Sequence, residues 1–422
     1  MISDSQIDLQ NKLNLLNKYC NKWCLEVNCN KTKIIIFNKS GRLIQEPFYI
    51  GNTKIECVNK YKYLGIVLCS SGSFKEAKEL LFKKALKASF KLHKDMKSSD
   101  PSIKTQLHLF DHLIKPISLY NCEIWGMLTK CNLEKNKDIY DIYKDWNAEK
   151  LNMKFCKLIL GAGKKSTNIA ILSELGRLPM YCSIILSLLS YWHRIENMSE
   201  SSLLHCAYDE CKNLSQSDIN NWYNTVKFFC NKLDLNLLIC KKSNMTTFKG
   251  LLKKHIKKNF YRYWLNIHDK GQTFGKLDTY FLLKNTFATE KYLSLKSFEQ
   301  RKVLCKFRIS THELRIERGR YEYTKDTDGK KIPLERNQRI CTFCNLNCVE
   351  DEIHFLTNCP LYIEERKAFF HFLSDTYKNF NLLSNNQKFL WIMTNEDHSV
   401  LVKLCDFLTK CFIKRKTKTS VG

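Results

Sequence analysis

The spacing of apolar residues is helical over most of this chain. In residues 5–24, 75–97 and 248–265, apolar side chains recur every three or four positions, which is the period of one helix face. The same period predicts a helix over 102–115 and another after it that runs through Trp125. It predicts further helices over 137–160, 168–175, 181–197, 361–379 and 398–413. The pattern therefore predicts a mainly α fold.

Only the first 70 residues depart from this period. Residues 34–37 form a β-branched run suited to a buried strand. Residues 48–50 and 55–58 flank Gly51–Lys54, which predicts a hairpin, and residues 63–68 predict another strand. These strands are too few to make a domain alone, so we expect a small N-terminal β remnant in an α+β arrangement.

Changes in composition divide the chain into five regions. The first region is the helix-plus-strand unit, and the second is helical. The third is helical and basic and opens with a polar stretch, 200–245, which is the best candidate for an interdomain segment. A cysteine–histidine region and C-terminal helices with a basic tail follow. The predicted regions are 1–72, 73–199, 200–335, 336–365 and 366–422.

The charge balance points to a polyanionic partner. The chain has 69 Lys and Arg against 42 Asp and Glu, a net charge of +27. Such a balance is most often found in nucleic-acid-binding proteins and less often at membrane surfaces. The most apolar run, Met180–Trp192, is too short to span a bilayer, so we expect no membrane role. The 20 cysteines have no repeating spacing, which favours a reduced intracellular protein of the nucleus or cytoplasm.

One cysteine–histidine motif has the spacing of a zinc site. Cys341, Cys344, His354 and Cys359 form the pattern C-x2-C-x9-H-x4-C. Three thiolates and one imidazole can complete a tetrahedron around Zn²⁺, leaving no open position for a substrate. The motif therefore predicts a structural zinc site. Cys348 lies between the two halves and is an alternative ligand.

Two predicted helices carry cationic faces that suit phosphate binding. In residues 75–97 the lysines lie opposite the stripe that contains Leu81 and Leu92. In residues 248–265 the cations are mixed with Tyr261 and Trp264, which could stack on bases or simply complete a core edge. The predicted contacts are Lys83, Lys84, Lys87, Lys91, Lys94, Lys253, Lys254, Lys257, Lys258 and Arg262.

No self-sufficient catalytic constellation is present in the sequence. Gly161–Ser166 lacks the first glycine and the hydroxyl of a phosphate loop, and we interpret it as a helix break. Asp138, Asp141 and Asp145 share one helix face, whereas two-metal chemistry needs carboxylates that converge from different elements. We therefore predict no catalytic residues.

Several ordered motifs resemble one known family. They comprise residues 19–28 with Lys31-Thr32-Lys33, then Tyr61–Gly65, Leu119–Gly126, and the cysteine–histidine motif with Glu350-Asp351-Glu352. In this order and spacing they resemble the C-terminal part of a non-LTR (LINE-type) retrotransposon reverse transcriptase. The likeness covers about residues 1–195 and 300–365 and is weak between these ranges.

The resemblance implies a role in gripping template RNA and primer DNA. Residues 1–72 would be the end of the polymerase palm, 73–199 the thumb, and 336–365 a zinc knuckle in the C-terminal region. Lys31 and Lys33 would lie near the primer end, and Arg336 and Arg339 would contact phosphates beside the knuckle. Fingers and most of the palm would be partners supplied by the intact protein.

One departure from the family determines the expected chemistry. The family's Tyr-x-Asp-Asp turn does not occur in these 422 residues, and we expect it just upstream of Met1. Without those carboxylates nothing holds the catalytic Mg²⁺, which is implied only for the intact polymerase. We therefore predict a chain that binds nucleic acid but does not polymerise alone. The alternative is an RNA-binding or interaction protein that a host has reused.

Overall fold

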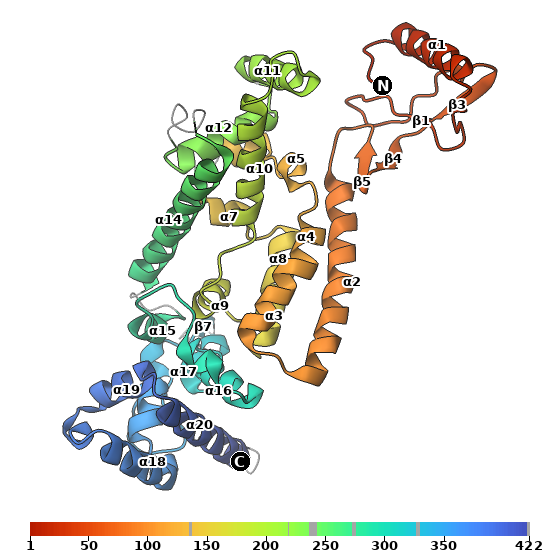
Figure 1. Ribbon diagram of the computed structural model, residues 1–422. Coiled ribbons are helices and arrows are strands. Elements are labelled where there is room, and N and C mark those ends of the chain that lie inside the picture. The colour runs from red at the N-terminus through yellow and green to blue at the C-terminus, as the bar shows by residue number, and fades with distance from the viewer. Residues whose placement is uncertain (135–136, 218, 236–242, 272–275, 326–329, 420–422) are drawn as a thin grey trace.

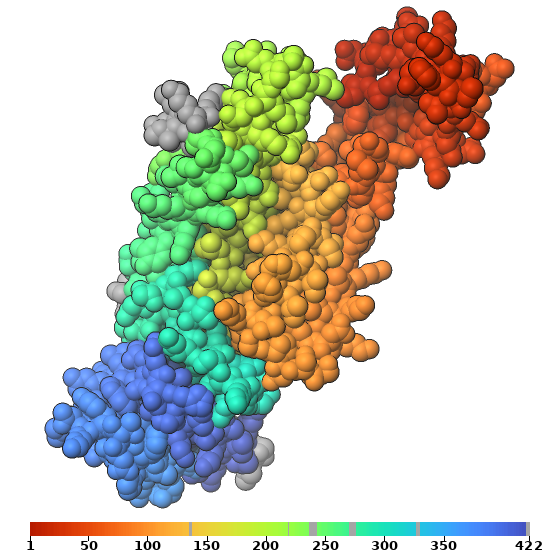
Figure 2. Space-filling view, viewed as in Figure 1, coloured from red at the N-terminus to blue at the C-terminus, as the bar shows by residue number. Residues whose placement is uncertain are grey.

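The computed structural model describes residues 1–422 except 135–136, 218, 236–242, 272–275, 326–329 and 420–422 (Figure 1). It confirms a mainly α protein with a small N-terminal sheet region. A buried apolar core runs through the helical body from Ile66 to Cys411, and a separate small core lies within the N-terminal unit. Figure 2 shows this unit protruding from the body at the top right.

The N-terminal unit packs one helix on a three-stranded sheet. Helix α1 (Gln6–Lys22) contacts β2 (Phe48–Ile50), which forms the predicted hairpin with β3 (Thr53–Cys57). Strand β1 (Lys33–Ile34) pairs in parallel with β3 on its other side. The predicted buried strand 34–37 is therefore too long, since pairing with β3 ends at Ile34 and Phe37 is 62% exposed.

A turn divides the strand predicted over residues 63–68. The chain instead forms β4 (Lys60–Tyr63) and β5 (Ile66–Cys69), which pair as an antiparallel hairpin. Leu64 and Gly65 between them both have positive φ, 46° and 89°. Two successive left-handed residues make the tight turn that matches strand twist, so the prediction of one continuous strand over this apolar run is wrong.

The long helix α2 (Lys75–Ser99) leads from this hairpin into the helical body. Its stripe of Leu81, Ala85, Leu92 and Met96 is buried, as predicted. Helix α2 packs against α4 (Lys115–Ser118), α8 (Asn147–Ile159) and a π-helical turn (Phe110–Ile114). The other short helices here are α3 (Ile103–Leu109), α5 (Cys122–Trp125), α6 (Lys130–Glu134), α7 (Ile139–Tyr143) and α9 (Asn168–Glu174). The predicted helix 137–160 is thus interrupted between α7 and α8.

Helix α10 (Tyr181–Glu196) lies at the centre of the upper body (Figure 1). It contacts α5, α11 (Leu203–Gln216), α12 (Trp222–Lys232) and α14 (Met245–Gly271). The polar stretch 200–245 therefore supplies two helices, and Val226 and Phe229 of α12 are buried in the main core. Residues 236–242 of this stretch lie outside the described residues, and the five-region division stays a prediction.

The C-terminal part gathers short elements around α20 (His398–Thr419). Helices α16 (Phe298–Arg308) and α18 (Ile363–Thr376) pack against α20 (Figure 1). The loop predicted over residues 323–331 contains the exposed hairpin β6 (Tyr323–Lys325) and β7 (Lys331–Pro333), of which 326–329 are not described. The remaining helices are α15 (Asp278–Leu283), α17 (Arg315–Arg318) and α19 (Asn385–Thr394). The basic tail is the last turns of α20.

Candidate metal centre and basic surfaces

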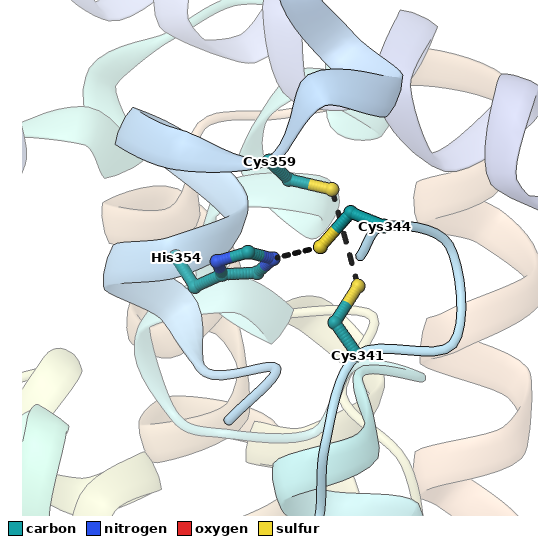
Figure 3. Close-up of side chains that lie close together, drawn as sticks. All are labelled: Cys341, Cys344, His354 and Cys359. Carbon is teal, nitrogen blue, oxygen red and sulfur yellow. Dashed lines mark hydrogen bonds between the residues drawn. The ribbon is translucent and has the colours of Figure 1, made fainter. Parts of the chain in front are cut away.

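The four motif residues converge on one point (Figure 3). Cys341 and Cys344 lie in the loop that follows a 3-10 turn (Arg336–Gln338), while His354 begins a π-helical turn (His354–Asn358) and Cys359 follows it. Their ligand atoms all lie within 4.8 Å of one another. Among the described residues this is the group of cysteines, histidines and acids that could hold a metal ion.

The distances match a tetrahedron around a small cation. Cys341 Sγ lies 3.9 Å from Cys359 Sγ, and Cys344 Sγ lies 3.5 Å from His354 Nε2. Zinc bonds of about 2.3 Å to sulfur and 2.0–2.1 Å to nitrogen give tetrahedron edges of about 3.8 Å and 3.6 Å. The sulfurs are also too far apart for a disulfide, whose bond is about 2.05 Å.

Cys348, the alternative ligand, lies outside the group of four converging side chains. The Cys348 side chain is exposed and its thiol donates to Leu346 O at 3.2 Å. Its carbonyl accepts from Cys341 N at 2.9 Å, so its backbone closes the loop that presents Cys341. Cys348 thus supports the site through its main chain.

Protonation controls what this site can hold. The hydrogen bond to Cys359 and burial raise the pKa of the Cys341 thiol to about 12. Thiolate is the metal-binding form, so a metal must displace that proton and its affinity falls at low pH. All four positions come from the protein, which suits a structural metal.

Three consecutive acids attach the site to the surrounding helices. Asp351 accepts the backbone N–H of His354 at 2.8 Å and so caps the turn that carries this ligand. Glu352, which is 2% exposed, accepts hydrogen bonds from Ser310, His312 and Thr279. Burial opposes ionisation of Glu352, but the hydrogen bond and charge of His312, together with the hydrogen bond from Ser310, outweigh it and lower the pKa of Glu352 to about 2.

Glu350 joins the site to the C-terminal helix. Both of its carboxylate oxygens accept from the guanidinium of Arg415, one of them at 2.9 Å. The Arg415 guanidinium also lies 4.5 Å from the ring centroid of Phe343, between the first two cysteines. Arg415 is 4% exposed, so this part of the predicted basic tail is a structural clasp.

Two arginines predicted to contact phosphates are engaged within the protein. Arg339 is 8% exposed, and its guanidinium donates to the carbonyl oxygens of Leu334 and Ile316. It is held inside because Gly319 leaves room for its stem. The hydrogen bonds of Arg339 thus engage its guanidinium within the fold, whereas Arg336 is part-exposed and pairs with Asp278 at 3.2 Å. Both phosphate contacts stay predictions.

The predicted lysine face of α2 is exposed along its whole length. We call Lys83, Lys84, Lys87, Lys91 and Lys94 the α2 lysine face. Among its members, Lys83 pairs with Glu79 at 3.3 Å, and no ion pair is found for the others within the described part of the chain. The face is therefore free to meet a polyanion.

The second predicted face, on α14, has the expected exposed cations, but one of its two aromatic rings is buried. Lys253, Lys254, Lys257, Lys258 and Arg262 are all exposed, and Arg262 pairs with Asp234 at 3.0 Å. Trp264 is fully buried against Phe287, which resolves its role in favour of the core. Tyr261 is 38% exposed and stacks on Trp264.

The fold places part of the α14 face at a groove that the spacing of residues in the sequence did not reveal. Lys253 and Lys257 border a hollow of about 1040 Å³ with Lys104 of α3, Lys115 of α4 and Lys291. No ion pair involves these five lysines within the described residues. The acids of the wall are already engaged, Asp111 with Arg177 at 2.7 Å and Glu290 with Arg308 at 2.9 Å. We call this hollow the lysine groove.

The lysines predicted near the primer end lie in the N-terminal unit, away from the lysine groove. Lys33 pairs with Glu56 at 2.6 Å, and Lys31 is exposed. The acids on the helix face of Asp138, Asp141 and Asp145 are also separate from the cysteine–histidine cluster, and Asp141 pairs with Lys144 at 2.9 Å. Within the described residues, no helix is long and apolar enough to cross a bilayer.

Comparison with known proteins adds no assignment. No family model, curated protein or solved structure matches this chain. The resemblance to reverse transcriptases therefore stays a prediction from the motifs themselves.

Proposed function

We propose that this chain binds nucleic acid through the lysine groove and the α2 lysine face. The observation that carries the proposal is the convergence of five unpaired lysines, from segments as distant as Lys104 and Lys291, on one hollow. Unpaired cations gathered in a groove repel one another, and a row of phosphates removes that repulsion while releasing counterions. Among the described residues that line the groove there is no Phe, Tyr or Trp, and its ring is that of His108, which suits contact with a sugar–phosphate backbone more than with a row of stacked bases.

The motifs favour a particular setting for this binding. In the reverse transcriptase lineage that they resemble, the grip would hold template RNA and primer DNA during target-primed synthesis, and Mg²⁺ would be needed only in the intact polymerase. This chain alone would then bind without polymerising. The knuckle, residues 336–365, would hold zinc as a structural ion that braces the C-terminal helices.

Matched charge reversals test the proposal. The double variant K253E/K257E changes the lysine groove, while K378E/K403E makes the same change in net charge at exposed lysines of the C-terminal region. Fluorescence anisotropy with a single-stranded RNA and with a primed RNA–DNA duplex measures affinity across a salt series. We expect K253E/K257E to weaken binding and flatten its salt dependence by roughly 0.7–0.9 per lost contact, with the control close to wild type. Equal losses in both variants would overturn the proposal.

A further inference from the structure

A second hollow lies where α2 begins, and it differs in kind from the lysine groove. Its volume is about 740 Å³, within the range of small-ligand sites. It combines aromatic rings, lysines and carboxamides, which come from the first turns of α2, from the end of α5 and the segment after it, from the start of α8 and from the residues just before α12. The residues that matter here are Phe74, Lys75, Lys78, Phe82, Lys83, Trp125, Asn147 and Asn220.

Lys78 is the central feature of this hollow. Its ammonium lies 4.3 Å from the ring centroid of Trp146 and 5.5 Å from that of Trp125. No carboxylate pairs with it in the described part of the chain, since the nearby Glu79 pairs with Lys83 and Glu76 pairs with Lys60 at 2.5 Å. Partial burial of an ammonium costs solvation free energy, and contact with ring faces alone offsets only part of that cost.

The rest of the lining is suited to a planar, hydrogen-bonding group. Phe74 and Phe82 are half-buried, so part of each ring remains accessible for stacking. Asn147 is exposed and offers an amide donor and acceptor, as the polar edge of a base requires. Cation, aromatic surface and carboxamide together match the phosphate, the base plane and the base edge of a nucleotide.

We propose that this hollow binds a single unpaired nucleotide, with its phosphate at Lys78 and Lys75 and its base against Phe74 or Phe82. The inference deepens the proposed function and rests on it for the source of the nucleotide. Lys83 belongs both to the hollow and to the α2 lysine face, so a strand that follows this face leads directly to the hollow. The bound nucleotide is then a strand end or an unstacked nucleotide, whose entry into the hollow costs little unstacking free energy.

Titration with mononucleotides tests the site without the strand. Tryptophan fluorescence of the full chain, in which Trp125 and Trp146 flank Lys78, reports binding of AMP, with adenosine and inorganic phosphate as separate arms. We expect saturable binding of AMP, at least tenfold weaker binding of adenosine and of phosphate, and at least a tenfold loss of AMP affinity in K78M. K78R keeps the charge and restores most of the binding, while the exposed-site control K403M matches wild type.

Two outcomes separate this inference from the proposed function. If RNA binding is intact but AMP gives no saturable response, or K78M binds AMP like K403M, the hollow is not a nucleotide site. If AMP binds and depends on Lys78 while oligonucleotides do not bind, the hollow stands and the proposed function fails. The variant F82L, which removes a stacking surface and leaves both lysines, should weaken AMP but not phosphate, and equal effects on both would also overturn the assignment.

Discussion

The knuckle and the lysine-bearing helices use charge in opposite ways. In and next to the knuckle, buried charged groups have partners: Glu350 binds Arg415, and Glu352 binds His312. Arg366, directly after the knuckle, donates to the carbonyls of Leu356, Phe355 and Cys359. On the α2 lysine face and in the lysine groove, most of the cations are exposed, and most lack an acidic partner among the described residues. The same residue types therefore hold the fold together in one region and remain available to a ligand in the other.

The difference follows from what burial costs. A buried charge that loses its partner is strongly destabilising, so a buried cation has to be satisfied within the fold. An exposed lysine gains little from an ion pair and loses little without one. Exposure and pairing, rather than position in a basic stretch, thus distinguish Arg339 and Arg415 from Lys87 and Lys91. The predictions below change each region in turn.

Loss of a metal ligand should have the largest effect. We expect wild type to bind about one zinc ion per chain and C359S to bind none. We also expect C359S to lower the free energy of unfolding by about 4 kcal/mol or more, as loss of a metal does. Cys359 is buried in the tetrahedral cluster, whereas Cys348 is exposed outside it. Metal analysis and denaturant unfolding measure both effects.

The matched control for the ligand change is C348S. It should keep the metal and unfold like wild type, because only the backbone of Cys348 supports the site. If C348S lost zinc while C359S kept it, the choice of Cys359 rather than Cys348 as a ligand would be wrong. Treatment with a strong chelator should reproduce the C359S result in wild type and leave C359S unchanged.

Breaking the clasp should have the next largest effect. R415M removes the partner of Glu350 and leaves a carboxylate that is 1% exposed without its cation, which should cost about 3 kcal/mol of unfolding free energy. The exposed K418M variant on the same helix is the control, with a change below about 0.5 kcal/mol. Affinity for RNA should change little in either variant, and a selective loss of RNA binding in R415M would place Arg415 among the ligand contacts.

The elements that could be predicted were those with a strong local signal. The helical period located α2 and its buried stripe, and the cysteine–histidine spacing identified the four residues that converge, because residues at fixed separations need little from the rest of the fold to meet. The turn at Leu64-Gly65 was missed because apolar residues continue through it. The short helices after Asp100, where Lys104 and Lys115 lie, show no cationic run. Their place beside Lys253 depends on long-range packing, which residue spacing does not encode.

Burial of the knuckle arginines was also beyond the sequence. Arg336 and Arg339 are separated by two residues and looked equivalent, yet one is part-exposed and the other is buried. What separates them is the space over Gly319, against which the Arg339 stem packs. The acidic run Glu350–Glu352 was visible, but its division among Arg415, His354 and His312 required the tertiary structure.

Neutralising part of the α2 lysine face should have a moderate effect on binding alone. We expect K87M/K91M to lower RNA affinity and to reduce the slope of log affinity against log salt by roughly 1.4, two single-strand contacts. Stability should stay within about 0.5 kcal/mol of wild type because both side chains are exposed. The control K378M/K403M carries the same net charge. If both pairs shift the slope equally, net charge rather than this face governs binding.

The smallest effect should come from Lys78, which combines features of both regions. Burial lowers its pKa from 10.5 to about 8, so between pH 8 and 10.5 the unfolded chain holds a proton that the folded chain has released. Stability attributable to this residue therefore rises with pH across that window, while below pH 8 its full cost is present. Subtracting the unfolding free energy of K78M from that of wild type cancels the other lysines. In the absence of ligand, we expect this difference in unfolding free energy to move in favour of wild type by about 1 kcal/mol from pH 7.5 to pH 10. AMP should abolish this movement, because a bound phosphate keeps Lys78 charged, whereas a flat difference without AMP would mean that Lys78 is as well solvated as the α2 lysine face.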